Sequence, residues 1–257
     1  MIPKITELKT HVLHGTSCLV IVAVLALAGC AATQQPRGPL SSGVQESGFL
    51  QDLYPLMHDG EKGQPLRLYR NPKFDTLVAD GYEKIFIDSV TIYGGPESKL
   101  NEVPQDELKN LAIICAGELA EKLSKDYQLV NEPGPRTMRI QAVITDAQPT
   151  KTTYKAISHI PMPLGVPGVK FALLKSKELA TGRPVFAGEV TGEVKMVDTQ
   201  SGEILLAAVD RRVGARLGGG WKSWTDAEQA FRYWAEKIRY WMCNKIRHGT
   251  NCVAPEE

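Results

Sequence analysis

The order of apolar and polar residues along the chain predicts a strand and then a helix in its first half. Residues 82–93 are rich in Ile, Val, Phe and Tyr and alternate in part, which is typical of a strand, and Gly94-Gly95-Pro96 ends it. Between residues 105 and 125 the apolar positions recur at steps of three and four, which predicts a helix with one apolar face. These positions are Leu108, Leu111, Ala112, Cys115, Leu119 and Leu123.

A second strand, a hairpin and a last helix follow. Residues 138–145 alternate between apolar and polar, and residues 186–197 and 204–213, joined by a turn at 198–202, predict a β-hairpin. In its first strand one face is apolar, whereas the other carries Glu189, Thr191, Glu193 and Lys195, so we expect that face to be largely solvated. Thr225 and Glu228 form a capping box for a helix. Its buried stripe is Ala227, Ala230, Phe231, Trp234, Ile238, Trp241 and Met242.

This order of elements predicts an α+β fold. We expect a mixed, mainly antiparallel sheet of four to five strands with two amphipathic helices packed on one face. Each helix has one apolar stripe, so it can cover a sheet face but cannot be buried between two layers. The other face of the sheet is then solvated or covered by a partner.

The first thirty residues have the pattern of a bacterial lipoprotein leader. Lys4 and Lys9 precede an eleven-residue apolar run, residues 18–28, that ends at Leu27-Ala28-Gly29-Cys30. Spanning a bilayer takes about 20 apolar residues, so the run is too short for a membrane anchor. We interpret residues 1–29 as a signal peptide whose removal leaves Cys30 at the N-terminus. The alternative, a buried strand or helix at 18–28, fits poorly with the Gln-, Pro-, Gly- and Ser-rich sequence that follows.

In this interpretation Cys30 is the lipidation site. Its sulfur takes diacylglycerol and its amine an acyl chain such as palmitate, and at ~0.8 kcal/mol per buried methylene the attachment is effectively permanent. Ala31, and not Asp, follows, which by the usual bacterial sorting rule favours the outer membrane, with the protein facing the periplasm. We expect residues 30–46 to be a flexible tether and residues 47–257 to form a single α+β periplasmic domain.

The charge balance and the spacing of the cysteines and histidines argue against nucleic acid and metal ions as partners. The 30 Lys and Arg nearly balance the 29 Asp and Glu, which argues against nucleic acid. Cys243 and Cys252 bracket a short C-terminal segment and could form a disulfide, whereas Cys115 is expected to be a small buried residue. The spacing of the cysteines and of His58, His159 and His248 does not suit zinc, so we expect no metal and no other cofactor.

Motifs spread over most of the chain after residue 46 carry a resemblance to a known family. They are Ser47-Gly48-Phe49-Leu50 with Asp52 and Leu56, Leu66-Arg67 with Tyr69, Tyr82, Lys84, Ile87-Asp88 and Val90, Asp198, Ser201-Gly202-Glu203 and Leu205, Asp210-Arg211-Arg212, and Trp234-Ala235. In these the chain resembles a bacterial lipoprotein family known as domain of unknown function 3313. Leu53, Tyr54 and Ser89 depart from the expected pattern. The resemblance implies a location and an architecture but no mechanism.

Three segments are candidates for chemistry, and each has a structural alternative that we favour. Residues 216–220 could hold an anion on backbone amides, but they lack the Walker spacing and suit a connector. Asp210-Arg211-Arg212 could belong to an active site, but structural ion pairs, for example with Asp88 or Glu189, are the better interpretation. Ser158-His159 lacks the Gly-x-Ser-x-Gly elbow of a nucleophile.

An uncharged, proline-stiffened segment at 160–169 is a candidate docking surface. Its candidate contact residues are Pro161, Met162, Pro163, Leu164, Val166 and Pro167. Such a segment is either packed on the domain or exposed for a protein or a lipid. We therefore expect a non-catalytic, outer-membrane-anchored lipoprotein that binds an envelope protein. The alternative is a hydrolase or binding module for cell-wall or glycan substrates, in which Asp88, Asp210 or Glu193 meets a second carboxylate or an aromatic platform in a cleft.

Overall fold

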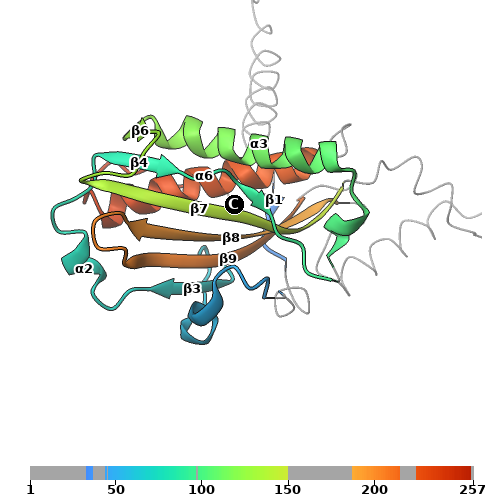
Figure 1. Ribbon diagram of the computed structural model, residues 1–257, viewed down its shortest axis with the longest axis horizontal. Helices are drawn as coiled ribbons and strands as arrows, with labels where there is room; N and C mark the ends of the chain where they lie inside the picture. Colours follow the sequence, from blue (N-terminus) through green and yellow to red (C-terminus); the bar gives the residue numbers. More distant parts are fainter. Residues whose placement is uncertain are drawn as a thin grey trace, which may run out of the picture. The chain divides into compact units, whose positions relative to one another are not determined.

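A mixed β-sheet forms the centre of the protein (Figure 1). The computed structural model describes residues 33–36, 44, 46–96, 98–149, 187–214 and 224–255. Within them the sheet has nine strands, in the order β2-β3-β9-β8-β7-β4-β6, with β1 beside β9 and β5 beside β7. The strands are β1 (Thr33–Gln34), β2 (His58–Asp59), β3 (Arg67–Arg70), β4 (Lys84–Ile87), β5 (Thr91–Ile92), β6 (Gln128–Val130), β7 (Thr137–Gln148), β8 (Glu189–Asp198) and β9 (Ile204–Gly214).

The predicted fold class is right and the predicted strand number is too small. Only the pairs β4–β6, β4–β7 and β5–β7 are parallel, so the sheet is mainly antiparallel. The long strands β7, β8 and β9 occupy the predicted positions, and β8 and β9 form the predicted hairpin. The strand expected at 82–93 is split into β4 and β5, which both pair with β7.

Two long helices pack together over one face of the sheet, as predicted (Figure 1). Helix α3 (Gln105–Leu123) buries the expected apolar stripe, including Cys115. Helix α6 (Thr225–Lys245) begins with Trp224, and not Thr225, at the N-cap position. Polar contacts join the two helices, since the Trp224 indole donates to Glu107 at 2.6 Å and Lys122 pairs with Glu236. The short helix α2 (Phe74–Leu77) places Phe74 against Trp241 of α6.

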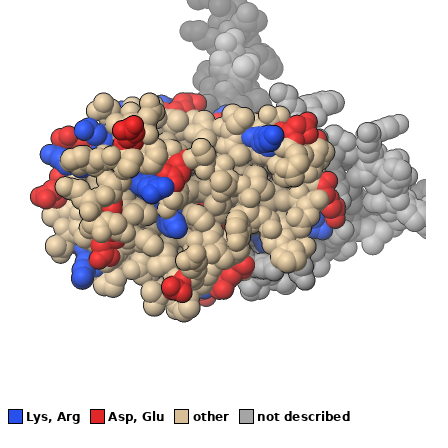
Figure 2. Space-filling model, viewed as in Figure 1, with Lys and Arg blue, Asp and Glu red and all other residues tan. Residues whose placement is uncertain are grey.

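The opposite face is not solvated throughout, which corrects the expectation from the alternation in β8. The 3-10 helix η2 (Gln51–Leu56) and the residues before it lie on this face of β9. There Leu50 and Tyr54 pack on Ala207 and Val209 in a second apolar cluster. Glu193 is only 2% exposed. In Figure 2 charges of both signs are scattered over the visible side of the molecule.

Residues 33–36, which lie within the predicted tether of residues 30–46, contact the sheet. Strand β1 pairs with the end of β9, Thr33 opposite Gly214 and Gln34 opposite Val213. The Gln35 side chain donates to the Gln64 carbonyl at 2.6 Å and to Asp210 at 2.8 Å. These partners lie far away in the sequence, so local composition could not reveal the pairing.

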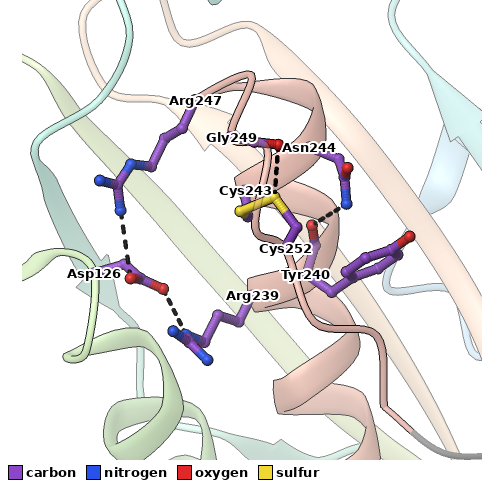
Figure 3. The surroundings of a disulfide bond; sticks show 8 residues. All are labelled: Asp126, Arg239, Tyr240, Cys243, Asn244, Arg247, Gly249 and Cys252. Atoms are coloured by element: carbon purple, nitrogen blue, oxygen red, sulfur yellow. Dashed lines mark hydrogen bonds and ion pairs between the residues drawn. A yellow bond between two sulfur atoms is a disulfide. The ribbon is translucent and has the colours of Figure 1, made fainter.

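The C-terminus is fastened to the end of α6 by a disulfide between Cys243 and Cys252 (Figure 3). It is the disulfide that the sequence analysis named as one these two cysteines could form. Close by, Asp126 pairs with both Arg239 and Arg247 and so holds the end of α6 against the turn that follows α3. The 3-10 helix η3 (Lys99–Glu102) lies at the opposite end of α3, before its first residue.

Candidate functional site

The sheet is wider than the two helices that cover it. Strands lie about 4.8 Å apart, so seven strands in line span about 29 Å, whereas two packed helices cover about 20 Å. Helix α3 contacts β4 and β5, and α6 contacts β8 and β9. Helix α6 is thus the long helix on the β9 side of the sheet, and β3 lies next to β9.

A cavity of about 230 Å³ lies between α6 and the sheet, and its lining reaches from β3 to β7. Leu68 of β3, Leu206 and Ala208 of β9, and Val194 and Met196 of β8 form its floor. Helix α6 supplies Phe231, Trp234, Ile238 and Trp241, which recur on one helical face. Cys115 and Leu119 of α3 and the loop 63–65 complete the wall. The lining is thus almost entirely apolar.

Asp210 provides the polar end of the cavity. It points to the helix side of β9, where its carboxylate accepts hydrogen bonds from the Trp234 indole at 2.7 Å and from Gln35 at 2.8 Å. Burial raises the pKa of Asp210 above its ordinary value, although the charge of Arg212 and both hydrogen bonds oppose this shift. The bond to Asp210 fixes the indole ring of Trp234 in the cavity wall.

Arg212 lies two residues further along the same face of β9 and is 2% exposed. Its guanidinium sits 3.7 Å from the centre of the Tyr233 ring and donates to the Thr33 carbonyl at 2.9 Å. Such a cation–π contact is strongest where water is excluded. Arg212 therefore joins β1, β9 and α6 through a cation–π contact and a hydrogen bond.

Two lysines of α6 lie among the cavity residues. Lys237 stands 5.8 Å from the ring centres of both Tyr233 and Tyr240, and Lys245 is exposed near the end of the helix. The cavity thus combines an apolar interior with positive charge from α6. This is the arrangement that an apolar group with neighbouring negative charge would fit.

The three carboxylates proposed for a hydrolytic cleft do not meet in this site. Asp210 faces the helices, whereas Glu193 points to the opposite side of the sheet and accepts from Tyr54 at 2.8 Å and from Ser47 at 2.9 Å. Asp88 does not pair with Arg211 or Arg212; it accepts from Arg139 at 2.8 Å and 2.7 Å and from Gln141 at 2.7 Å. The Arg139 hydrogen bonds and charge lower the pKa of Asp88 despite partial burial.

The Glu193 cluster is a second polar arrangement, on the face that η2 covers. Burial raises the pKa of Glu193, against the effect of its hydrogen bonds from Tyr54 and Ser47. The Tyr54 hydroxyl in turn accepts from the backbone amides of Gly48 and Leu50. Tyr54 departs from the family pattern expected at this position, yet it holds the preceding segment on the sheet.

Several predicted site residues lie outside the described part of the chain. These are Cys30, the docking segment with Pro161, Met162, Pro163, Leu164, Val166 and Pro167, the dipeptide Ser158-His159 and residues 216–220. Cys243 and Cys252 lie at the far end of α6 and take no part in the cavity lining. Among the described residues no cluster of three or more His, Cys, Asp or Glu is placed to hold a metal ion. Likewise, none of the described helices has the length and apolar character needed to cross a membrane.

In the sequence the cavity residues of α6 form a helical stripe, which predicts a buried core face. Trp234, Ile238 and Trp241 recur at the expected spacing and are only partly buried. The sequence pattern could not distinguish a fully covered stripe from one that borders a cavity. Loop 63–65 also lines the cavity, but it lies between short strands, and no apolar periodicity in the sequence indicates its position.

The family model described as "Protein of unknown function (DUF3313)" matches residues 45–238, which is most of the chain. The protein belongs to this DUF3313 family. The match covers η2, the whole cavity floor and α6 up to Ile238, whereas the cavity residues Trp241 and Lys245 lie beyond it. No curated protein matches the chain.

Solved structures resemble this DUF3313 chain only distantly. One is a PelC dodecamer from Paraburkholderia phytofirmans, 12% identical over 59% of this chain and 82% of the other, with a TM-score of 0.30. A second, the protein XCC0632 from Xanthomonas campestris, is 7% identical over 70% and 92%, with a TM-score of 0.36. A third, a hemagglutinin homolog from Helicobacter pylori, is 10% identical over 74% and 95%, with a TM-score of 0.36. Likeness at this distance says nothing about what the chain binds.

Proposed function

We propose that this protein is a lipoprotein of the outer membrane, anchored through Cys30, whose periplasmic domain is non-catalytic and binds an envelope protein. The single observation that supports binding is the cavity beside α6. It is an apolar recess with aromatic walls, set between α6 and the sheet.

The size of the cavity favours a side chain of a partner protein over a free small molecule. Pockets for small molecules usually measure about 300–1,000 Å³, whereas this one measures about 230 Å³. A recess of this size suits one or two large apolar side chains, and protein interfaces gather their binding energy at such central pockets. Trp234 and Trp241 supply the aromatic walls that these anchor sites commonly have.

The positive charge beside the cavity indicates which residues the partner segment should carry. Lys237 and Lys245 bring positive charge to the cavity, so the partner segment should carry an apolar anchor with Asp or Glu beside it. Catalysis has less support, because Asp88, Asp210 and Glu193 each have separate partners and two of them lie across the sheet from the third. General acid–base hydrolysis needs two such groups at one substrate.

Site-specific photo-crosslinking in living cells tests this proposal. A photoreactive amino acid at position 62, which is exposed beside the loop 63–65 of the cavity wall, should give one discrete adduct with an envelope protein, identified by mass spectrometry. The adduct should disappear in Trp241→Ser and Ile238→Glu, which remove the apolar walls. The matched control is position 113, because Ile113 is 68% exposed on α3 and Ile113→Glu leaves the cavity intact.

The outcomes separate the parts of the proposal. Equal crosslinking from positions 62 and 113, or an adduct that survives both cavity variants, would exclude the cavity as the binding site. Recovery of a tightly bound small molecule by native mass spectrometry would replace the protein partner. Mass spectrometry of the N-terminal peptide tests the anchor independently, because an unmodified thiol at Cys30 contradicts it.

A further inference from the structure

A second cavity, the C-terminal cavity, lies beside the disulfide at the end of α6 and measures about 320 Å³. Its lining is mainly polar and includes Asp126 in the turn after α3, Arg239 of α6, Arg247 just after α6, and residues 249–253. Pockets for small molecules usually measure about 300–1,000 Å³. The C-terminal cavity therefore has the size and the polarity that suit a small polar molecule.

Two arginines share one carboxylate in this cavity. Figure 3 shows both guanidinium groups turned toward Asp126. Arg239 binds one carboxylate oxygen through its Nε atom, and Arg247 pairs with the other oxygen through Nη1 at 3.4 Å. Among the described residues, the two terminal nitrogens of Arg239 and the Nε and Nη2 atoms of Arg247 have no hydrogen-bond partner. The side chains are 36% and 50% exposed, so a ligand can reach these nitrogens.

The charge of the lining favours an anion. Its charged residues are Asp126, Arg239 and Arg247, which together carry a net charge of +1. Carbonyl groups at a helix C-terminus oppose anion binding when they are left unpaired. Here the Met242 carbonyl accepts from the Arg247 amide at 3.1 Å, and the Cys243 carbonyl accepts from the amide of residue 249 at 2.9 Å. The guanidinium groups are therefore the strongest charges that a ligand in the cavity meets.

The disulfide fixes the C-terminal segment that forms the rest of the wall. His248, with a φ of 50°, turns the chain back after α6, and the bond from Cys243 to Cys252 holds it there. Gly249 packs so closely on this bond that a Cβ would lie 2.9 Å and 3.1 Å from the two sulfur atoms. The backbone amides of residues 250–253 have no partner among the described residues. They remain available as donors in the same cavity as the arginines.

We propose that the C-terminal cavity binds a small phosphate monoester. Arginine recognises carboxylate and phosphate groups through two parallel hydrogen bonds. A carboxylate has only two oxygens, whereas a phosphate monoester offers three terminal oxygens and up to two negative charges. The free nitrogens of the two arginines and the amides of residues 250–253 provide more donors than two oxygens can use, which favours phosphate. The remaining volume holds the organic part of the ester, beside the polar side chains of Thr250 and Asn251.

This binding site is independent of the proposed function. It does not involve the lipid anchor, and it shares no residue with the apolar cavity between α6 and the sheet. Its structural alternative is a simple clamp, in which Asp126 holds the end of α6 and no ligand binds. The two differ in what the outward nitrogens of Arg239 and Arg247 do, and this difference is measurable.

Isothermal titration calorimetry of the full-length protein with glycerol 1-phosphate tests the proposal. The wild-type protein should bind one equivalent. Arg247→Gln should weaken binding at least about 10-fold, since a hydrogen bond to a charged group contributes about that factor. Arg247→Lys should also weaken binding, because it keeps the charge but loses the planar fork. The matched control is Arg232→Gln on the same helix, since Arg232 pairs with Glu118 outside this cavity, and its affinity should equal that of the wild type.

Two further measurements define the site and the ligand. Cys243→Ser with Cys252→Ser releases residues 250–253 and should weaken binding of glycerol 1-phosphate. Inorganic phosphate should compete with glycerol 1-phosphate, whereas acetate at the same concentration should not. Urea unfolding curves of each variant show whether it is folded, and Arg247→Lys decides the result if Arg247→Gln folds poorly.

Four results would overturn the proposal. Absence of binding at millimolar glycerol 1-phosphate would leave only the structural clamp. An equal loss in Arg247→Gln and Arg232→Gln would mean that binding follows the net charge and not this cavity. Competition by acetate as strong as that by phosphate would exclude the phosphate group as the recognised chemistry. Binding only to vesicles of phosphatidylglycerol, and not to glycerol 1-phosphate, would exclude a small soluble ligand.

Discussion

The hydrogen bonds between Tyr54 and Glu193 should make a large and pH-dependent contribution to stability. The Tyr54 hydroxyl donates to the buried Glu193 carboxylate at 2.8 Å and accepts from two backbone amides, of Gly48 and Leu50. Hydrogen bonds to charged groups contribute about 1.5–3 kcal/mol, and a buried donor left unpaired adds to the loss. We therefore expect Tyr54→Phe to lower the free energy of unfolding by about 2–3 kcal/mol at neutral pH.

The sign of the pH dependence follows from the pKa of Glu193, which burial raises in the folded protein. Between the unfolded pKa near 4.5 and the higher folded pKa, the folded protein binds more protons than the unfolded chain. The stability contributed by protonated Glu193 is thus fully present below that window and is lost as pH rises through it. Asp210 has a shift in the same direction, so only the difference between variants isolates Glu193.

Glu193→Gln should remove this part of the pH profile. The wild-type protein should be more stable than the variant at low pH, and the difference should shrink as pH rises. The measurement is urea unfolding of the Cys30→Ser chain at several pH values between 4 and 8. The double variant Tyr54→Phe, Glu193→Gln completes a double-mutant cycle with the two single variants. The coupling free energy should exceed about 0.5 kcal/mol, because the two groups are in contact.

Tyr69→Phe is the matched control. Tyr69 packs against the same apolar cluster but has no hydrogen bond from its hydroxyl among the described residues, so its loss should change stability by less than about 0.5 kcal/mol. The reasoning is refuted if Tyr54→Phe costs no more than Tyr69→Phe, or if wild-type protein and Glu193→Gln have parallel pH profiles.

Three further changes test other parts of the fold. In Gly192→Ala the new Cβ would lie 3.0 Å from the Trp234 ring and 3.3 Å from the Val143 carbonyl. Denaturant unfolding should therefore show a free energy of unfolding that is lower by about 1–3 kcal/mol. The control is Gly117→Ala, a helical site with open space, where the free energy of unfolding should rise by up to about 1 kcal/mol. Gln35→Ala removes the bonds to Asp210 and Gln64 and should cost about 1–3 kcal/mol and speed proteolysis before residue 47; unchanged cleavage would mean that β1 is held otherwise. Cys243→Ser with Cys252→Ser removes the disulfide and should lower the free energy of unfolding by about 2 kcal/mol. Faster hydrogen exchange should be confined to the end of α6, and faster exchange throughout the sheet would contradict this expectation.

The sequence predicted the elements whose pattern is long and local. Helices α3 and α6 and strands β7, β8 and β9 extend over ten or more residues, and their apolar periodicity determines type and position. Strands β1 and β2 contain two residues each, so no alternation exists to be detected. They form because β9 and β3 offer unpaired backbone groups at the right place, which is a property of the assembled sheet.

The candidate site was harder to predict for the same reason. Glu193 alternates with apolar neighbours exactly as a solvated residue would, and it is buried because Ser47 and Tyr54, about 140 residues earlier, supply its hydrogen bonds. Trp234, Ile238 and Trp241 fit an ordinary core stripe. They line a cavity between α6 and the sheet, and part of its lining, Leu68, comes from the short strand β3, which left no pattern.

The pairing of β1 with β9 also determines the order in which the protein can be completed. Thr33 and its partner Val213 are 180 positions apart, and synthesis delivers the N-terminal residue first. Strands β1 and β3 both pair with β9, so the N-terminal segment cannot dock on the sheet until most of the chain has been synthesised. Such non-local closure is intrinsically slow. A product that stops before residue 204 would therefore leave β1 without its partner and β3 paired with β2 alone, and proteases that clear incomplete chains would find both strands accessible.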